Sequence, residues 1–223
     1  MLNIHNSNTD PYFNIATEKY LLKNSSEDLF MMWQNESSVI IGRHQDVDAE
    51  VNTDFARENQ IKIARRISGG GAVYHDLGNV NLTFIERNSK YDFSKYSIMM
   101  IDFLNTLGIN ATRDERLGLN IDGLKISGSA QYAYKGTALY HATLLFSSNL
   151  VILDKVLLKS KNSKKTKFVH SVASPVTNIC EHLKSPMLID DFKKKIMNHF
   201  TGESYTFDKK ELASIEQLKT EQR

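Results

Sequence analysis

The chain has 223 residues, of which 41% are hydrophobic and 24% charged, a composition typical of a globular protein with one sizeable core. Its net charge of +2 is too small to indicate a nucleic-acid partner, because duplex-binding proteins carry a concentrated basic face. A single cysteine excludes an internal disulfide framework, and the sequence lacks the apolar runs of a secretory signal or a membrane span. These features predict a cytoplasmic protein that binds neither nucleic acid nor membrane.

The first predicted element is a helix over 11–24, because Asp10-Pro11 is a helix-start signal and apolar residues recur at helical spacing behind it. Residues 28–34 and 37–43 have the composition of strands, and the "NES" between them predicts a hairpin. A surface helix is predicted over 48–60.

Strands dominate the middle of the chain, and helices dominate its last third. The predicted strand segments are 61–68, 71–76, 79–86, 117–134 and 138–147, with a turn at 76–79. The predicted helices are 93–108, 150–160, 188–200 and 209–222. Gly108 closes the first of these helices, and Asp122-Gly123 is the signature of a tight turn between two strands.

This order of elements predicts an α+β fold with a mainly antiparallel or mixed central sheet flanked by helices, instead of alternating βαβ units. We expect one domain over residues 1–223, with a helical C-terminal segment from about residue 188.

The stretch "RRISGGGAVYHDLGN", from Arg65 to Asn79, contains three consecutive glycines behind two arginines. Glycines in a row contribute no side-chain packing, and they are common in wide turns. They also allow successive N–H groups to approach an anion, in a backbone nest to which adjacent arginines add charge. The stretch matches neither the Walker A loop nor the dinucleotide-binding glycine motif, so any phosphate site here has another design.

Extended to Phe84, the same stretch resembles the signature of the lipoate–protein ligase A family, whose catalytic fold is shared with biotin–protein ligases. Further pieces agree with that family in order and spacing over roughly residues 10 to 200. These pieces are "DPYFNIATEKYLL", "FMMWQNESSVIIGRHQD", "DGLKISGSAQ", "YHATLLFSSNL" and "SVASPVTNI".

The resemblance implies a lipoate–protein ligase that converts lipoate and ATP, with Mg²⁺, to lipoyl-AMP. The lipoyl group would then pass to a lysine of a lipoyl domain, as in the E2 subunit of 2-oxoacid dehydrogenases, or of the glycine-cleavage H protein. One alternative is a lipoyl or octanoyl transferase of the same fold that uses a preformed acyl-adenylate or acyl-carrier donor. Another is a non-catalytic subunit that binds acyl-domain proteins.

Lys125 is the candidate catalytic residue. It lies between apolar Leu124 and Ile126 in a predicted strand, so alternation places it on the same face as Ser127. Most lysines are simply exposed, but one fixed in a shielded pocket can hold a carboxylate beside a phosphate and offset developing charge. In the family, the lysine at this position contacts the acyl carboxyl and the nucleotide phosphate. The resemblance therefore implies that Lys125 acts as a fixed cation, and not as a nucleophile.

The resemblance also implies which residues surround the two reactants. The nucleotide is expected to be bound by Arg66, Ser68, Gly69, Gly70, Gly71, Ala72, Val73, Tyr74 and Lys125. The acyl pocket is expected to be lined by Trp33, His75, His141, Thr143 and Leu144. For His141 the sequence leaves a second interpretation open, a buried histidine that merely bonds its neighbours.

Two features depart from the family pattern. Many members read Arg-Asn-Asp ahead of the lysine motif, where this chain reads Arg116-Leu117-Gly118. The missing acidic residue would have to be replaced by Asp114 or Asp122. The small C-terminal accessory domain of many ligases is also not evident, so an accessory-domain partner for adenylation is a further expectation.

The remaining features predict no additional chemistry. Cys180 is interpreted as a structural thiol, because the cysteine motifs of acyl-carrying transferases are missing around it. The seven histidines show no metal-ligand spacing, so no protein-held metal is expected. The lysine-rich run at 159–167 is predicted to be an exposed loop, and it is a candidate for steering an acidic acceptor domain.

Overall fold

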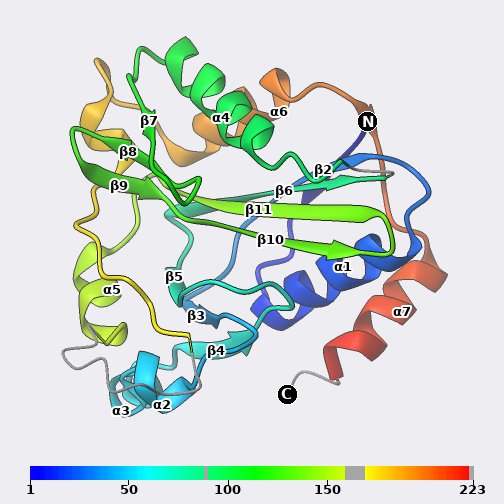
Figure 1. Ribbon diagram of the computed structural model, residues 1–223, viewed down its shortest axis with the longest axis horizontal. Helices are drawn as coiled ribbons and strands as arrows, with labels where there is room; N and C mark the ends of the chain where they lie inside the picture. Colours follow the sequence, from blue (N-terminus) through cyan, green and yellow to red (C-terminus); the bar gives the residue numbers. More distant parts are fainter. Residues whose placement is uncertain (88–89, 159–168, 221–223) are drawn as a thin grey trace.

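A mixed six-stranded sheet forms the centre of the computed structural model, which describes residues 1–87, 90–158 and 169–220 (Figure 1). Its strands, in the order β10-β11-β6-β2-β1-β12, are Ser129–Tyr134, Thr137–Leu145, Asn79–Glu86, Leu29–Trp33, Leu2–Asn6 and Glu203–Ser204. Pairing is antiparallel from β10 to β2, whereas β1 is parallel to both β2 and β12. The predicted α+β fold with a mixed central sheet is confirmed.

Two small sheets lie beside the large one. The first has the order β4-β3-β5, with β4 at Lys62–Arg65, β3 at Ser38–Ile41 and β5 at Val73–His75. The second has the order β7-β8-β9, with β7 at Thr112–Arg113, β8 at Leu119–Ile121 and β9 at Leu124–Ser127. Asp122 and Gly123 connect β8 to β9 with φ angles of 49° and 79°. This positive pair is the tight hairpin turn that Asp-Gly predicts.

The predicted hairpin over residues 28–43 is wrong, although both strands exist. Strand β2 pairs with β1 and β6 in the large sheet, whereas β3 pairs with β4 and β5 in the small one. All five residues of β2 are buried, so the strand needs covered faces on both sides. A central position in the large sheet supplies this cover, and a hairpin with β3 would not.

The single surface helix predicted over 48–60 is replaced by two short helices, α2 (Val47–Glu50) and α3 (Thr53–Glu58). Val51 leaves the helix between them and forms an isolated bridge with Leu157. Asn52 then caps α3 by accepting the N–H of Phe55. The local helical signal is interrupted because Val51 is buried against a distant part of the chain.

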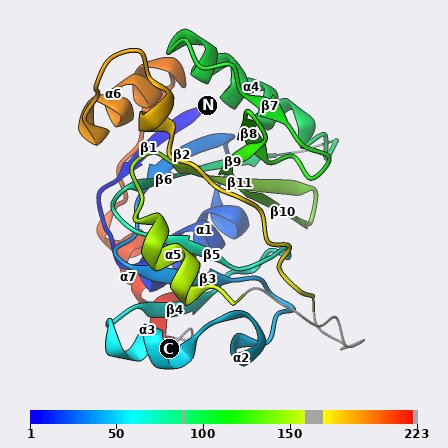
Figure 2. The same cartoon turned by 90° about the vertical axis from the view of Figure 1, so that its left-hand side faces the viewer.

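Helices cover both faces of the large sheet (Figures 1 and 2). On one face, α4 (Ser94–Thr106) and α6 (Ile189–His199) bury side chains such as Phe103 and Phe192 against Phe30, Phe84 and Tyr140. On the other face lie α1 (Pro11–Asn24) and the β4-β3-β5 sheet. The helix α5 (Leu150–Val156) follows β11, a short helical turn spans Ile179–His182, and α7 (Lys209–Thr220) packs on α1.

Helix α1 is enclosed on several sides, and this explains why it lacks a single apolar stripe. Phe13 and Ala16 contact Ile215 of α7. Ile15 packs against the β4-β3-β5 sheet, and Leu22 packs against the large sheet. The helix therefore lies between the two sheets, and its Glu18 side chain is buried there.

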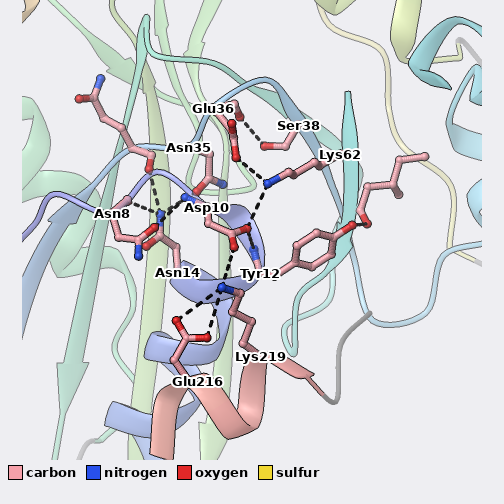
Figure 3. Close-up of polar contacts among 12 residues, drawn as sticks. Asn8, Asp10, Tyr12, Asn14, Asn35, Glu36, Ser38, Lys62, Glu216 and Lys219 are labelled. Carbon is pink, nitrogen blue, oxygen red and sulfur yellow. Dashed lines mark hydrogen bonds and ion pairs between the residues drawn. The ribbon is translucent and has the colours of Figure 1, made fainter. Parts of the chain in front are cut away.

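An ion-pair network at the start of α1 connects three distant segments (Figure 3). The Asp10 carboxylate caps α1 by accepting the N–H of Tyr12, and it lies 3.0 Å from Lys219 Nζ of α7. It also lies 3.5 Å from Lys62 Nζ of β4, whose ammonium donates to Glu36 at 2.6 Å.

Among the described helices, none has the length and apolarity needed to cross a membrane.

Candidate functional site

The glycine loop, residues 66–72, connects β4 to β5 and is folded around one buried arginine. The Arg66 side chain is 6% exposed, and its guanidinium donates to Ser68 Oγ at 3.0 Å and to Ile40 O at 3.0 Å. It also donates to the carbonyls of Gly69 at 2.6 Å and Gly71 at 2.7 Å. Arg66 thus holds the loop through two of its carbonyl oxygens.

Arg66 remains a cation inside the protein. Burial lowers the pKa of the guanidinium to about 10, and the Glu18 carboxylate acts in the opposite direction. Glu18 is 1% exposed, so the two charges compensate each other in an environment shielded from water.

The N–H groups of the glycine loop differ from its carbonyls, two of which Arg66 binds. Gly70 adopts φ +87°, which side-chain-bearing residues rarely reach. Within the described part of the chain, the N–H groups of Gly69, Gly70 and Gly71 donate no hydrogen bond. The backbone of Gly42 lies against the loop, and a Cβ at this position would lie 2.2 Å from the carbonyl oxygen of Gly70. Three successive donors in the described part of the chain thus have no protein partner, which is what a backbone nest requires.

A buried chain of hydrogen bonds crosses the site from the glycine loop to α1. Ser68 Oγ lies 2.8 Å from His141 Nε2, and His141 Nδ1 lies 2.9 Å from a carboxylate oxygen of Glu18. Thr83 donates to the same carboxylate at 2.6 Å and accepts the indole N–H of Trp33 at 2.9 Å. Both ring nitrogens of His141 are therefore satisfied within the protein, as in the second interpretation given above.

His75 has the opposite arrangement, with one ring nitrogen left over. Its Nδ1 accepts from the Asn35 side-chain amide at 3.0 Å, which assigns the proton of the neutral ring to Nε2. Burial, followed by the charges of Arg66 and His141, lowers the pKa of His75 to about 3. Its Nε2–H is buried and has no partner, and the ring meets the edge of Trp33 at 6.0 Å. His75 is therefore a neutral ring whose buried Nε2–H has no acceptor among the described residues.

Lys125 lies across from the glycine loop on β9. Its Nζ is 3.9 Å from a carboxylate oxygen of Asp114, and its side chain is 24% exposed. Val73, Thr143 and Lys125 surround the bare backbone of Gly128, each within 4 Å of the place where a Cβ would lie. Strands that are far apart in sequence thus bring the lysine next to the end of the glycine loop. The Thr143 hydroxyl accepts the N–H of Gly128 at 3.0 Å and so supports this junction.

A segment over 169–178 runs from the α2 corner to β9, the gold trace in Figure 2. Its C-terminal part pairs with β9 through the backbone of Lys125. The N–H of Lys125 donates to Pro175 O at 2.8 Å, and the carbonyl of Lys125 accepts the N–H of Thr177 at 3.1 Å. The same segment therefore contacts both sides of the site.

The N-terminal part of this segment lies on the glycine loop. Ser171 Oγ accepts the N–H of Ala72 at 2.8 Å and the side-chain amide of Gln45 at 3.1 Å. The buried Glu50 carboxylate accepts from Ser171 N–H and lies 3.0 Å from His170 Nδ1. A hydroxyl oxygen thus occupies one donor of the loop, at a position where an anionic oxygen would also fit.

Most of the predicted site residues converge, but Leu144 does not. Trp33, His75 and His141 lie on the α1 side of the large sheet, whereas Leu144 is fully buried in the core under α4 and α6. Because successive side chains of a strand alternate between faces, Leu144 and Thr143 point to opposite sides. The expectation that Leu144 lines the same pocket is corrected accordingly.

The backbone of β5 has a structural role besides any nucleotide contact. Val73, Tyr74 and His75 pair with β3, and the Tyr74 hydroxyl lies 3.0 Å from Ser37 Oγ.

Cys180 is half-buried, and burial together with the charge of Glu181 raises the pKa of its thiol. Such a thiol lacks the electropositive surroundings of a reactive cysteine. The lysine run at 159–167 lies outside the described residues.

Sequence reasoning missed the residues that support the site from other elements. Glu18, Asn35 and Ser171 bond His141, His75 and Ala72 respectively. Glu50 acts one step further away, because it accepts from the N–H of Ser171. Within the ranges that the structure describes, no group of three or more His, Cys, Asp or Glu side chains converges to hold a metal ion.

Comparisons with known proteins identify the family and the fold of the chain. A family model described as the lipoyl protein ligase A/B catalytic domain matches residues 10–201. The chain is 36% identical over 234 residues to lipoate-protein ligase LplJ of Bacillus subtilis, with 99% of this chain and 71% of that protein covered. Two solved structures share the fold. A bi-partite lipoate protein ligase from Thermoplasma acidophilum, studied with its E2 lipoyl domain, gives a TM-score of 0.82 at 24% identity and covers 98% of this chain and 91% of that one. A lipoate-protein ligase A bound with ATP gives 0.82 at 23%, covering 98% and 94%.

Proposed function

Because the chain belongs to the lipoyl protein ligase A/B catalytic-domain family, we propose that it is an ATP-dependent lipoate–protein ligase. The observation that carries this proposal is that Lys125 and Val73 meet at Gly128. Val73 directly follows the glycine loop, whose Gly69, Gly70 and Gly71 N–H groups have no partner among the described residues. This set of donors suits a reaction in which a carboxylate meets a phosphate.

The reaction has two steps. In the first, a lipoate carboxylate oxygen bonds to the α-phosphorus of ATP and pyrophosphate leaves, giving lipoyl-AMP. In the second, the amine of an acceptor lysine bonds to the lipoyl carbonyl carbon, loses a proton and displaces AMP. Both steps place negative charge on oxygens between the acyl and phosphate groups, where preorganised donors are most effective.

Some of these residues bind the phosphates of the nucleotide, and others bind the lipoyl group. The N–H groups of Gly69, Gly70 and Gly71 bind the phosphate oxygens, and Lys125 contacts the reacting carboxyl and phosphate. The Nε2–H of His75 donates to the acyl portion next to Trp33. Arg66 acts mainly by holding the loop, because its donors are already directed to loop atoms.

Mg²⁺ belongs to the proposal as a companion of ATP. The described residues offer no complete ligand set, whereas Mg²⁺ commonly keeps its waters and binds through phosphates and one or two carboxylates. When bound, it would shield charge on the phosphates.

The acceptor is a lipoyl-domain protein such as a 2-oxoacid dehydrogenase E2 subunit, or the glycine-cleavage H protein. The Thermoplasma acidophilum relative, a bi-partite ligase described with an E2 lipoyl domain, motivates this partner and also a possible second subunit. We place the reaction in the cytoplasm, in keeping with a chain that has one cysteine.

The test is ATP–pyrophosphate exchange with lipoate, octanoate and biotin in parallel. Lipoate-dependent exchange is the expected result, and biotin should support none. If no acid supports exchange but the protein transfers the lipoyl group from synthetic lipoyl-AMP to a lipoyl domain, it is a transferase of the same fold and not a ligase. If a lipoyl domain binds but neither exchange nor transfer occurs, the protein is a binding subunit.

Substituting Lys125→Ala is expected to lower the rate of lipoyl transfer by about 10²-fold or more, since it removes a preorganised cation from the reacting groups. The matched control is Lys194→Ala on α6, whose side chain is 74% exposed. The rate is measured by mass spectrometry of the acceptor domain. An equal rate for both variants would reject the assigned role of Lys125.

A further inference from the structure

The loop between β7 and β8 closes around the side chain of Asp114. One carboxylate oxygen, Oδ1, accepts the N–H groups of Arg116 and Gly118, both at 2.8 Å. The backbone N–H of Asp114 donates to Gly118 O at 2.9 Å, and Leu117 adopts φ +62° at the tip. The carboxylate is thus fixed relative to the backbone by short contacts on both sides of the loop.

The second carboxylate oxygen faces Lys125. It lies 3.9 Å from Nζ, with the Asp114 and Lys125 side chains 31% and 24% exposed. In the described part of the chain, Oδ2 has no hydrogen-bond donor of its own. The separation is that of an ion pair and is too long for a hydrogen bond, so attraction orients the ammonium and leaves its protons available.

Gly118 makes this approach possible. A Cβ at this position would lie 2.7 Å from Asp114 Oδ2, 3.1 Å from Lys125 Cε and 2.9 Å from Ser127 O. The φ of Gly118 lies outside the left-handed region, so the glycine is required by space and not by its backbone conformation. The carboxylate and the lysine stem therefore lie together in room that a side chain at position 118 would fill.

We infer that Asp114 is a positioning residue for Lys125, an inference that rests on the proposed function of the site. A lysine side chain has several rotatable bonds, and holding it in one place costs conformational entropy. A carboxylate fixed by its own loop reduces that cost before substrate arrives. The incoming carboxyl and phosphate oxygens then accept the protons that Asp114 does not engage.

The test is Asp114→Asn, which keeps an oxygen for the N–H groups of Arg116 and Gly118 and removes the charge. We expect kcat for lipoyl transfer from synthetic lipoyl-AMP to fall about 10-fold or more. KM for lipoyl-AMP and the calorimetric Kd for AMP should stay equal or decrease, because a negative charge next to the anion site is lost. Asp122→Asn is the matched control, since this exposed carboxylate in the β8–β9 turn is close to Lys125 in sequence but has a φ of 49° that asparagine tolerates.

A second measurement is independent of the reaction. The NMR order parameter of the Lys125 side chain should fall in Asp114→Asn and stay unchanged in Asp122→Asn. The inference is overturned if kcat and the order parameter match the unsubstituted protein, or if KM and Kd rise in step with the loss of kcat. A kcat deficit that is recovered by raising Mg²⁺ would make Asp114 a cation ligand, which also overturns it. Because preformed lipoyl-AMP needs no ATP, failure of ATP activation in the unsubstituted protein is detected separately.

Discussion

His75 shows how strongly the surroundings of one residue set its chemistry. Its type suggested a pocket residue, but only the contacts reveal that it is neutral and that Nε2 carries the proton. Arg66 shows the reverse case, in which a predicted nucleotide contact spends its donors on the protein's own loop. Both differences arise because hydrogen-bond partners come from elements that are distant in the sequence.

The burial of His75 predicts an acid-sensitive stability. Its pKa is about 3 in the folded protein and about 6.5 when unfolded, so only the unfolded chain takes up a proton between these values. The free energy of unfolding should therefore be constant above about pH 6.5 and decrease as the pH falls toward 3. At pH 4.5 the loss from this residue is about 3 kcal/mol.

Urea denaturation at pH 7 and pH 4.5 measures this effect. The His75→Gln variant should lose less stability between the two pH values than the unsubstituted protein. The exposed His44→Gln serves as a control that should behave like the unsubstituted protein. Equal losses for all three proteins would show that His75 is protonated in the folded state.

The glycine loop illustrates what a single element needs from its neighbours. Its own sequence predicted a nest of donors, and Gly70 with φ +87° agrees with that prediction. The loop also depends on Gly42 of the segment after β3, where the two backbones are in contact. This second glycine was not singled out by any pattern, because it is 28 residues away from Gly70 in the chain.

Replacing Gly42→Ala should displace the loop, since the new Cβ would lie 2.2 Å from Gly70 O. The expected cost is about 1–3 kcal/mol of unfolding free energy, as for other overpacked sites. Gly69→Ala is the control for stability, because nothing lies within 4 Å of a Cβ there. Thermal denaturation of both variants decides the matter, and similar melting temperatures would contradict the close packing.

At the scale of the whole molecule, the site is assembled from parts that meet only in the fold. The β4-β3-β5 sheet supplies the glycine loop, and β9 supplies Lys125. Helix α1 supplies Glu18, which is connected to the loop through His141. The segment 169–178 then joins the two sides of the site, and Glu50 of α2 anchors its beginning.

The variant Glu50→Gln tests this anchor. The amide would keep one acceptor and place N–H groups against a donor, either Ser171 N–H or the His170 ring. Hydrogen exchange at the amides of Ala72 and Ser171 should accelerate about 10-fold or more, since a hydrogen bond to a charged group contributes about 1.5–3 kcal/mol. Asp48→Asn, an exposed change on the same helix, should leave both amides unaffected, and unchanged exchange in Glu50→Gln would show that the segment is held by other contacts.

The sequence by itself determined the elements with strong local signals. The helix at 11–24, the strands around the glycine motif, the Asp122-Gly123 turn and the helix ending at Gly108 all follow from caps, glycines and periodicity. It also supplied the glycine loop as a candidate, because three consecutive glycines contribute no side-chain packing, and it supplied Lys125 through the resemblance of its motif to a known family.

Only the tertiary structure decided which strands pair and which side chains face the site. The separation of β2 from β3, the place of Leu144 under α4 and α6, and the choice of Asp114 over Asp122 as the neighbour of Lys125 all depend on long-range contacts. Local patterns report which faces are apolar, whereas the partner of each face is chosen by burial over the whole chain. The loop and the lysine were therefore visible in the sequence, and their common site was produced by the packing of the sheets around α1.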